Sequence, residues 1–473
     1  MHVRHSRIQH GVGQGSFHSA TVEFSLAPNV EHRFDYIYDC GALKYWREAP
    51  GLLYALGRVS LDKRGAGGSK AILDLLILSH FDSDHMNGAK KLVNRYSVDR
   101  IVLPYLGIQE LALVIANQAE MIDGDTIRQL HALTHGDDKF WGCPVTMVQT
   151  GPRQSEGRPG QADPRPVLET GELPAAQEFP HRVSVVLEST DARPDRVMSD
   201  EDNLIVRALS SQPDDAWKLR FWNRGMAARL GELILQHLAE VTFPVEALSD
   251  RVNGAQAIIA WLDFKPVKAP RKRAQTSVKS VKEPSYRDLA LEAYRKAITE
   301  FAPTWQNEAS GDSLANFLSL GLYSGPRFGS HDWQQAFHTP YPQGHWTCGN
   351  CNALHWREDE VLPGWIGTGD APLGEPGIWQ DFELHYSLEL PQVQTVVVPH
   401  HGAAPQASTR FYNPKLNHRE GMTAVVSYGV RNSYGHPHPS VVAGVAYAGA
   451  QLVHVTEDTR LGFQEIYSFW RWR

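Results

Sequence analysis

The chain has 473 residues, of which 42% are hydrophobic and 21% charged, which predicts a globular protein with one large domain and a second unit. A net charge of -7 excludes a general attraction to polyanions, so nucleic-acid binding would need a local basic patch. No apolar run approaches the length of about 18 residues that crosses a bilayer. Four cysteines are too few for a disulfide scaffold, so we expect a soluble, cytoplasmic protein.

The first half of the chain has the pattern of an α/β fold. Alternating apolar residues around 21–24 and 34–38 predict two antiparallel strands. Branched apolar segments at 71–77 and 101–106 predict buried strands. Leucines and isoleucines at helical spacing then predict a helix from Gln109 to Ala132.

A loop after the strand 71–77 carries four donor side chains, namely His80, Asp82, Asp84 and His85. Open α/β sheets bind ligands at the carboxyl ends of their strands, which is where this loop lies. So many donors would be costly to bury unpaired, and they can serve two cations about 3.5 to 4 Å apart. The alternative is a surface turn whose aspartates cap the following helix.

Two other features of this half do not predict a site. The glycine-rich segment 65–70 precedes a strand and lacks the Gly-Lys-Ser/Thr order of a phosphate loop. His131 and His135 lie near a predicted helix end, where capping or exposure is more common than ligation.

The middle of the chain predicts strands and then helices. Strands are expected at 183–187, 204–209 and 217–222, and the periodicity is helical from 226 to about 301. This helical part contains a basic run of Lys265, Lys268, Arg271, Lys272, Arg273, Lys279 and Lys282. The run is either a solvated linker or an arm that binds nucleic-acid phosphates, with Lys268, Arg271, Lys272 and Arg273 as substrate-binding residues.

Three later strands each end in donor side chains. The strand at 365–369 leads to Asp370, whose two carboxylate oxygens can bridge two cations. The strand at 395–399 leads to His400 and His401, and the strand at 423–428 leads to Asn432, Tyr434 and His436. A further Cys/His group could hold a structural zinc, although its spacing is cramped: His345, Cys348, Cys351 and His355.

The segment His80-Phe81-Asp82-Ser83-Asp84-His85 resembles the signature of metallo-β-lactamase-fold hydrolases, in the variant where aspartate replaces the second histidine. That variant is similar to ComEC-type DNA-uptake proteins and phosphorylcholine esterases. Further matching stretches follow the family's order, namely Gly13-Gln14-Gly15 with Tyr38-Asp39-Cys40-Gly41, Gly367-Thr368-Gly369-Asp370, Val398-Pro399-His400-His401-Gly402 and Asn432-Ser433-Tyr434-Gly435-His436-Pro437. Ser16 departs from the family, which usually has an acidic residue there.

The resemblance implies an αββα sandwich formed by 1–222 and 311–473, with a helical insertion at 223–310. The strand before the aspartate loop is either Ser313–Leu320, which resembles the family's Asn-x-x-Ser-Leu, or the segment at Asp202-Asn203-Leu204. The resemblance also implies two divalent metal ions, and mixed imidazole and carboxylate ligands suit zinc or manganese. One ion would take His80, Asp82, Asp370 and His401, and the other Asp84, His85, Asp370 and His436.

The remaining site residues take their expected roles from the same resemblance. Asp39 would support the metal loop from behind, and Asp84 would orient a metal-activated hydroxide. His400 would contact substrate phosphate, although either member of the His400–His401 pair could be the ligand. Asn432 and Tyr434 would hydrogen-bond the phosphate or the leaving group.

The expected function is a metal-dependent phosphodiesterase, specifically a nuclease that acts on DNA or RNA. Protein partners in nucleic-acid processing or defence would fit such an enzyme. The alternatives are a hydrolase of small phosphoesters, lactams or thioesters, and a binding subunit without catalysis, since one fold hosts many functions.

Overall fold

The computed structural model describes residues 2–27, 30–43, 50–59, 61, 70–151, 176–178, 183–188, 197–208, 216–264, 284–301, 318–327, 334–342, 363–374, 376–404, 422–458 and 462–470. Its strands are β1 (His2–Gln9), β2 (Phe17–Ala27), β3 (Val30–Cys40), β4 (Ile72–Leu73), β5 (Leu75–Ile77), β6 (Ser97–Val98), β7 (Ile101–Pro104), β8 (Val145–Gln149), β9 (Ala176–Glu178), β10 (Val183–Glu188), β11 (Val197–Ser199), β12 (Asn203–Ala208), β13 (Ala216–Trp222), β14 (Gly321–Pro326), β15 (Gln334–Pro342), β16 (Gly364–Gly367), β17 (Val393–Val397), β18 (Thr423–Ser427), β19 (Gln451–Val455) and β20 (Phe463–Trp470). Its α-helices are α1 (Pro50–Arg58), α2 (Ser83–Met86), α3 (Ala89–Arg95), α4 (Ile108–Asn117), α5 (Gly124–Thr134), α6 (Asp138–Trp141), α7 (Ala228–Glu240), α8 (Gly254–Leu262), α9 (Tyr286–Phe301), α10 (Pro376–His385) and α12 (Pro439–Tyr447). Short 3-10 turns include η1 (Val245–Leu248), η6 (Leu390–Gln392) and η7 (Pro399–Gly402).

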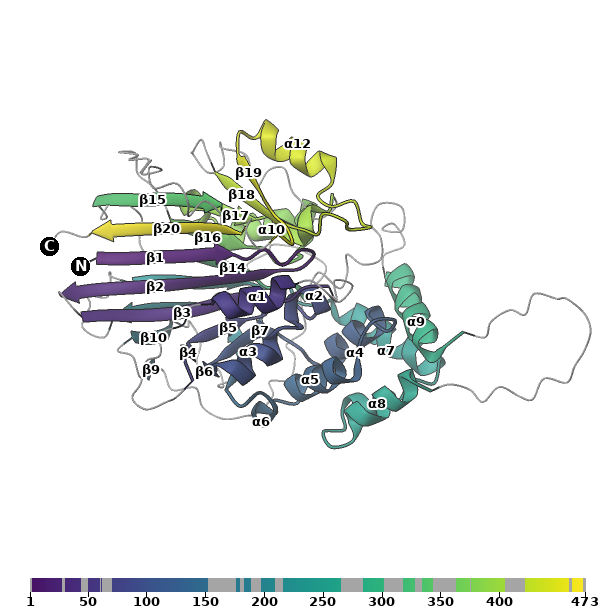
Figure 1. The fold of residues 1–473 in the computed structure, drawn as a ribbon. Helices are drawn as coiled ribbons and strands as arrows, with labels where there is room; N and C mark the ends of the chain where they lie inside the picture. Colours follow the sequence, from purple (N-terminus) through teal and green to yellow (C-terminus); the bar gives the residue numbers. More distant parts are fainter. Residues whose placement is uncertain are drawn as a thin grey trace, which may run out of the picture.

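Most strands belong to two nine-stranded sheets (Figure 1). The first has the order β11-β8-β7-β5-β3-β2-β1-β20-β15, and the second has the order β19-β18-β17-β16-β14-β13-β12-β10-β9. Each sheet combines a parallel part, β3-β5-β7-β8-β11 or β16-β17-β18-β19, with antiparallel strands. Parallel strands need crossover connections, and helices supply several of them here.

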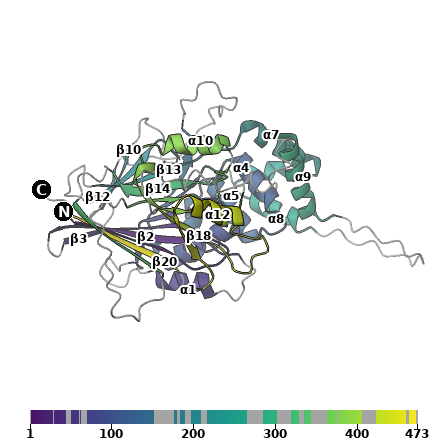
Figure 2. The same ribbon diagram turned by 90° about the horizontal axis from the view of Figure 1, so that it is seen from above.

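The three largest apolar cores of the described residues show how the sheets and helices are layered. Between the sheets, residues such as Val22 and Phe34 of the first pack against Trp217 and Leu219 of the second. The outer face of the first sheet shares an apolar core with α1, α3, α4 and α5, and α7 to α9 extend this core by packing on α4 and α5. The outer face of the second packs on α10 and α12, and Figure 2 shows α1 and α10 on opposite sides of the strands. This order of helices, sheet, sheet and helices confirms the expected α/β class.

The strands expected in the first half and in the middle of the chain are confirmed, except that one of them is divided into two. The expected strand 71–77 is split into β4 and β5 at Asp74, whose Oδ2 accepts a hydrogen bond of 2.6 Å from the backbone N–H of Asp35. The strand β1 was not predicted, because its inward-facing side chains include the polar residues His5, Arg7 and Gln9. The alternation of apolar and polar residues that marks a strand is therefore hidden.

The single helix expected at 109–132 is wrong. Two helices lie there, and the break between α4 and α5 spans residues 118–123. Asp123 caps α5, because its side chain accepts a hydrogen bond of 2.8 Å from the backbone N–H of Thr126. Such capping favours a new helix start over continuation of the old one.

The helical segment expected after 226 is confirmed for residues 226–264 and 284–301. Its helices α7, α8 and α9 share one apolar core with α4 and α5. The basic run from Lys265 to Lys282 and the group from His345 to His355 lie outside the described residues. Among the described helices, none has the length and apolar character that crossing a membrane requires.

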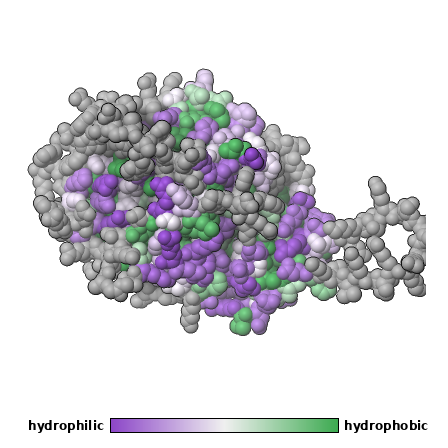
Figure 3. Space-filling view, in the orientation of Figure 1, coloured by the Kyte–Doolittle hydropathy of each residue, from purple (hydrophilic) through white to green (hydrophobic). Residues whose placement is uncertain are grey.

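The described surface in Figure 3 mixes hydrophilic residues with small groups of hydrophobic ones. Exposed apolar side chains include Tyr447 on α12 and Leu384 on α10. Scattered apolar residues are ordinary on a water-exposed surface and mark no site by themselves.

Candidate metal centre

Two histidines of the loop after β5 are held in fixed orientations. His85 donates from Nδ1 to Asp39 Oδ2 over 2.8 Å, since a carboxylate can only accept. His80 Nδ1 lies 2.9 Å from Ser79 Oγ, and that hydroxyl donates to Asp39 Oδ2 over 2.8 Å. With their Nδ1 protons engaged, both rings turn an Nε2 lone pair inward, as metal-binding histidines do. Asp39 therefore lies where its expected supporting role requires.

The turn η7 after β17 brings two adjacent histidines to the same place. His401 Nδ1 donates to Ser427 O over 2.8 Å, and its Nε2 lies 3.2 Å from Asp84 Oδ2. His400 Nε2 lies 3.6 Å from Asp370 Oδ2. His400 and His401 have φ values of 46° and 55°, a left-handed conformation that is strained for residues other than glycine. The strained turn directs both rings toward the loop.

Asp370, which follows β16, lies between the two groups of histidines. Its Oδ1 is 3.2 Å from His85 Nε2, and its Oδ2 is 3.4 Å from His80 Nε2. Gly369 precedes it with φ 53°, and a Cβ there would lie 2.9 Å from Ser79 Cβ. The two oxygens of one buried carboxylate thus face two different imidazoles, which is the arrangement of a bridging ligand.

The donor atoms form two overlapping groups, His80 with His85 and Asp370, and Asp84 with His85 and His401. Within each group the ligand atoms lie within 4.8 Å of one another. His80 Nε2, His85 Nε2 and Asp370 Oδ1 are buried without a hydrogen-bond partner. Such orphaned donors fit divalent cations, because burying them unpaired would be costly.

The charges of the cluster also favour a bound cation. Asp82, Asp84 and Asp370 converge, and in the described part of the chain no lysine or arginine pairs with any of them. Among the described residues, only protonated imidazoles or a bound cation can balance the negative charge of these three carboxylates. A bound cation is the simplest way to balance that charge in a buried place.

No protein-family model matches the chain. A search of curated proteins finds no match either. The interpretation of the cluster therefore depends on its own geometry and chemistry.

The pKa values of the cluster respond to this concentration of charge. Burial alone would lower the pKa of His85, but the carboxylates of Asp370 and Asp39 outweigh it and raise the pKa well above its usual value. Burial raises the pKa of Asp82 to about 6. Burial acts in the same direction on Asp84, but the hydrogen bond from His401 brings its pKa down to about 2. Protons and metal ions would therefore compete for the same ligands.

The structure corrects the expected grouping of the late histidines. His401 lies beside Asp84 and His85 rather than with His80 and Asp82. His400, expected to be free for substrate, lies beside Asp370 Oδ2 on the side of His80. His436 lies outside both groups, with its ring centroid 5.6 Å from that of His400. Both members of the adjacent pair thus reach the centre, because the turn separates their rings.

The loop after β18 also differs from expectation. The amide of Asn432 donates to Gly429 O and His436 O, each over 2.7 Å. Its Oδ1 accepts from the backbone N–H groups of Tyr434 and His436. Both donors and the acceptor are engaged in the loop, so Asn432 shapes the loop rather than binding phosphate. Tyr434 is 56% exposed and stacks on His436, where a substrate could contact it.

Two serines of the centre were not predicted as site residues. Ser79 links His80 to Asp39, and Ser319 Oγ accepts from the backbone N–H of Asp370 over 3.2 Å. Ser319 belongs to the Asn-x-x-Ser-Leu segment, whose described residues 318–320 therefore lie at the site, whereas Asp202 bonds the backbone of Ser199 instead. A single serine forms no spacing pattern that predicts a site. The resemblance of the segment around Ser319 to Asn-x-x-Ser-Leu could, however, have indicated this serine.

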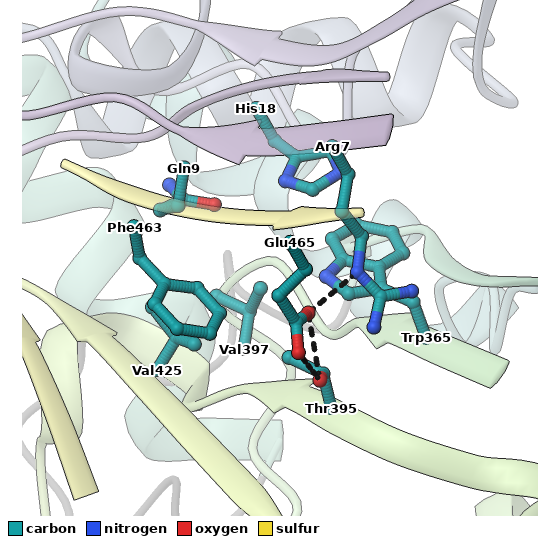
Figure 4. Close-up of a pocket in the computed structure, with 9 residues that line it drawn as sticks. All are labelled: Arg7, Gln9, His18, Trp365, Thr395, Val397, Val425, Phe463 and Glu465. Atoms are coloured by element: carbon teal, nitrogen blue, oxygen red, sulfur yellow. Dashed lines mark hydrogen bonds and ion pairs between the residues drawn. The ribbon is translucent and has the colours of Figure 1, made fainter. Parts of the chain in front are cut away.

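A second buried polar group lies between the sheets on strands that also lead to the centre (Figure 4). Arg7 Nε pairs with Glu465 Oε2 at 2.7 Å, and Thr395 donates to the same carboxylate over 2.8 Å. Arg7 also donates to Pro363 O over 3.0 Å, just before β16. Here one arginine balances one glutamate, so the group joins the two sheets and needs no added ion.

Proposed function

We propose that the protein is a metal-dependent phosphodiesterase with a metallo-β-lactamase-type αββα sandwich. The observation that carries this proposal is the position of Asp370, whose two oxygens face His80 and His85 within a buried, negatively charged cluster. The four-layer order and the sequence resemblance support the proposed fold.

Residues of this chain would hold two cations at neighbouring positions. The first position has His80, Asp82, His400 and Asp370 Oδ2, and the second has His85, Asp84, His401 and Asp370 Oδ1. This donor set suits zinc or manganese. Bound divalent cations would make a water nucleophilic near neutral pH and would neutralise charge on the phosphate oxygens.

The side chains around these positions would orient the substrate and the attacking water. Asp84 stays ionised near neutral pH, because its pKa is about 2 in the metal-free chain and a bound cation would take over the role of the hydrogen bond from His401. It can therefore accept a hydrogen bond from the attacking water. The exposed Tyr434 can donate to the phosphate or to the leaving group.

Nucleic acid is the substrate class we propose. Two adjacent cations neutralise the charged phosphodiester in the way that two-metal nucleases do. The basic run from Lys265 to Lys282 would add sequence-independent attraction to further phosphates. The net charge of -7 makes such a local patch necessary.

A cleavage screen tests the proposal. The metal-free protein would be reloaded with zinc or manganese and assayed on single- and double-stranded DNA, on RNA and on a small phosphodiester. Cleavage should require metal and should be lost in His85→Ala, while it should persist in His237→Ala, which changes a histidine of α7 that pairs with Glu240 and Glu300 outside the cluster. Full metal occupancy without cleavage of any phosphoester would instead favour a binding subunit, and activity on lactams or thioesters alone would favour another hydrolase.

A further inference from the structure

The residue that follows α4 contacts the metal loop directly. Gln118 is buried, and its Nε2 donates to Asp82 Oδ1 over 2.5 Å and to Phe81 O over 3.2 Å. Both amide hydrogens are thus used on the segment that carries Asp82. Gln118 is the residue at which α4 ends.

Asp82 needs such an anchor more than the other carboxylates of the centre. Its side chain is 30% exposed, compared with 15% for Asp84 and 4% for Asp370. It occupies the cap position before α2, yet its side chain makes no capping hydrogen bond. With Oδ1 fixed by Gln118, Oδ2 faces His80 Nε2 at 3.9 Å. A ligand side chain that is already held in place binds a metal ion more tightly than a mobile one, because it loses less conformational entropy on binding.

The turn that carries Gln118 is held in its place by the helical insertion. Arg287 of α9 donates from Nη1 to Ala119 O over 2.6 Å and to Ile122 O over 2.8 Å. Its Nη2 pairs with Asp263, at the end of α8, at 2.8 Å. One guanidinium therefore ties α8, α9 and the turn after Gln118 together.

We propose that Gln118 is a positioning residue for Asp82, and that Arg287 extends this positioning to the helical insertion. The inference rests on the proposed metal centre and assigns the insertion a part in it. It makes the first cation position, with His80 and Asp82, depend on the insertion. The second position, with Asp84 and His401, has no such connection through Gln118.

Metal titration of variants tests this selectivity. Gln118→Met keeps the length of the side chain and removes the amide, and Gln118→Asn is a second variant that stays polar but is too short to reach Asp82. Each metal-free protein would be titrated with cobalt(II) and followed by its absorption spectrum, and then with zinc. The control Gln236→Leu changes a glutamine on the exposed side of α7.

We expect wild type to bind two equivalents, and the Gln118 variants to bind one of them about 10- to 100-fold more weakly while the other is unchanged. Arg287→Met should weaken the same equivalent by a smaller factor, and Gln236→Leu should weaken neither. Thermal melting of the metal-free variants shows that they are folded. If both equivalents weaken equally in Gln118→Met and Gln118→Asn, or if neither weakens, the inference is overturned while the proposed function stands. A wild type that binds no metal would overturn the proposed function as well.

Discussion

The metal centre and the Arg7–Glu465 pair are both buried polar groups, and the strand β17 contributes to both of them. At the pair, the arginine neutralises the glutamate, and Thr395 donates to the remaining lone pairs. At the centre, three carboxylates meet several imidazoles, and the inward nitrogens of His80 and His85 lack hydrogen-bond partners. Burial of polar groups is tolerated in both places, but only the pair is satisfied by the protein itself.

The pKa values of His5 and His18 beside the pair and of His85 at the centre shift in opposite directions. Burial and then the positive charge of Arg7 lower the pKa of His5 and of His18 well below the usual value. At His85 burial acts in the same direction, but the carboxylates of Asp370 and Asp39 reverse the result. The sign of the neighbouring charge thus separates His85 from His5 and His18, whereas at His400 of the centre burial still prevails and lowers the pKa.

The largest effect is expected from Asp370→Asn. An amide has one oxygen and no charge, so it can neither bridge nor neutralise two cations. We expect both metal equivalents to be lost and phosphodiester cleavage to fall by on the order of a thousandfold. Elemental analysis and cleavage rates measure the two effects. Retention of two tightly bound ions would contradict the bridging role.

Glu465→Gln should act on stability instead. It leaves the Arg7 charge buried without its partner, which costs about 3 to 5 kcal/mol. Urea unfolding of the metal-free protein measures this loss. The double variant Arg7→Met with Glu465→Leu should recover most of it, since neither charge is then present. An unchanged unfolding midpoint in the single variant would mean that the pair is not needed.

Asp39→Asn tests whether Asp39 supports the candidate ligand His85. Asn also tolerates the left-handed conformation of this residue, whose φ is 59°. The fold should therefore persist, while metal affinity falls by about 10- to 100-fold, because the Nδ1 hydrogen bond of His85 is weakened. Isothermal titration with zinc measures the change. An affinity equal to that of wild type would argue against this support.

The smallest effect concerns pH. Below about pH 6.5 the unfolded chain takes up protons on His5 and His18, whereas the folded chain does not until a much lower pH. The free energy of unfolding therefore decreases as the pH falls, by up to about 1.4 kcal/mol per pH unit for each histidine. His18→Gln should reduce this slope by one proton in urea titrations between pH 6.5 and 5. A slope equal to that of wild type would show that His18 is protonated in the folded state.

In the metal-free protein, His85 should have the opposite effect on stability. Its raised pKa contributes stability that is present below about pH 6.5 and is lost as the pH rises through the folded value. The two regions thus have opposite effects in adjoining pH ranges, and His85→Asn should remove the gain in stability that wild type shows as the pH falls toward about 6.5. Comparing His85→Asn with His18→Gln separates the two contributions.

The sequence by itself determined the α/β class, most of the strands, and the placement of candidate ligands at strand ends. These follow from local periodicity and spacing, which need no knowledge of distant contacts. For example, the branched run before His80 predicts a buried strand whatever it pairs with. The same local rules missed β1, because its buried side carries His5, Arg7 and Gln9.

Only the tertiary structure decided which donors share a position. The left-handed turn at His400 and His401 regrouped the ligands, and the loop's own backbone engaged Asn432. The contact of Gln118 with Asp82 joins residues 36 positions apart, one at the end of α4 and the other in the loop after β5. Such pairings depend on the packing of whole elements, which a pattern of neighbouring residues does not encode.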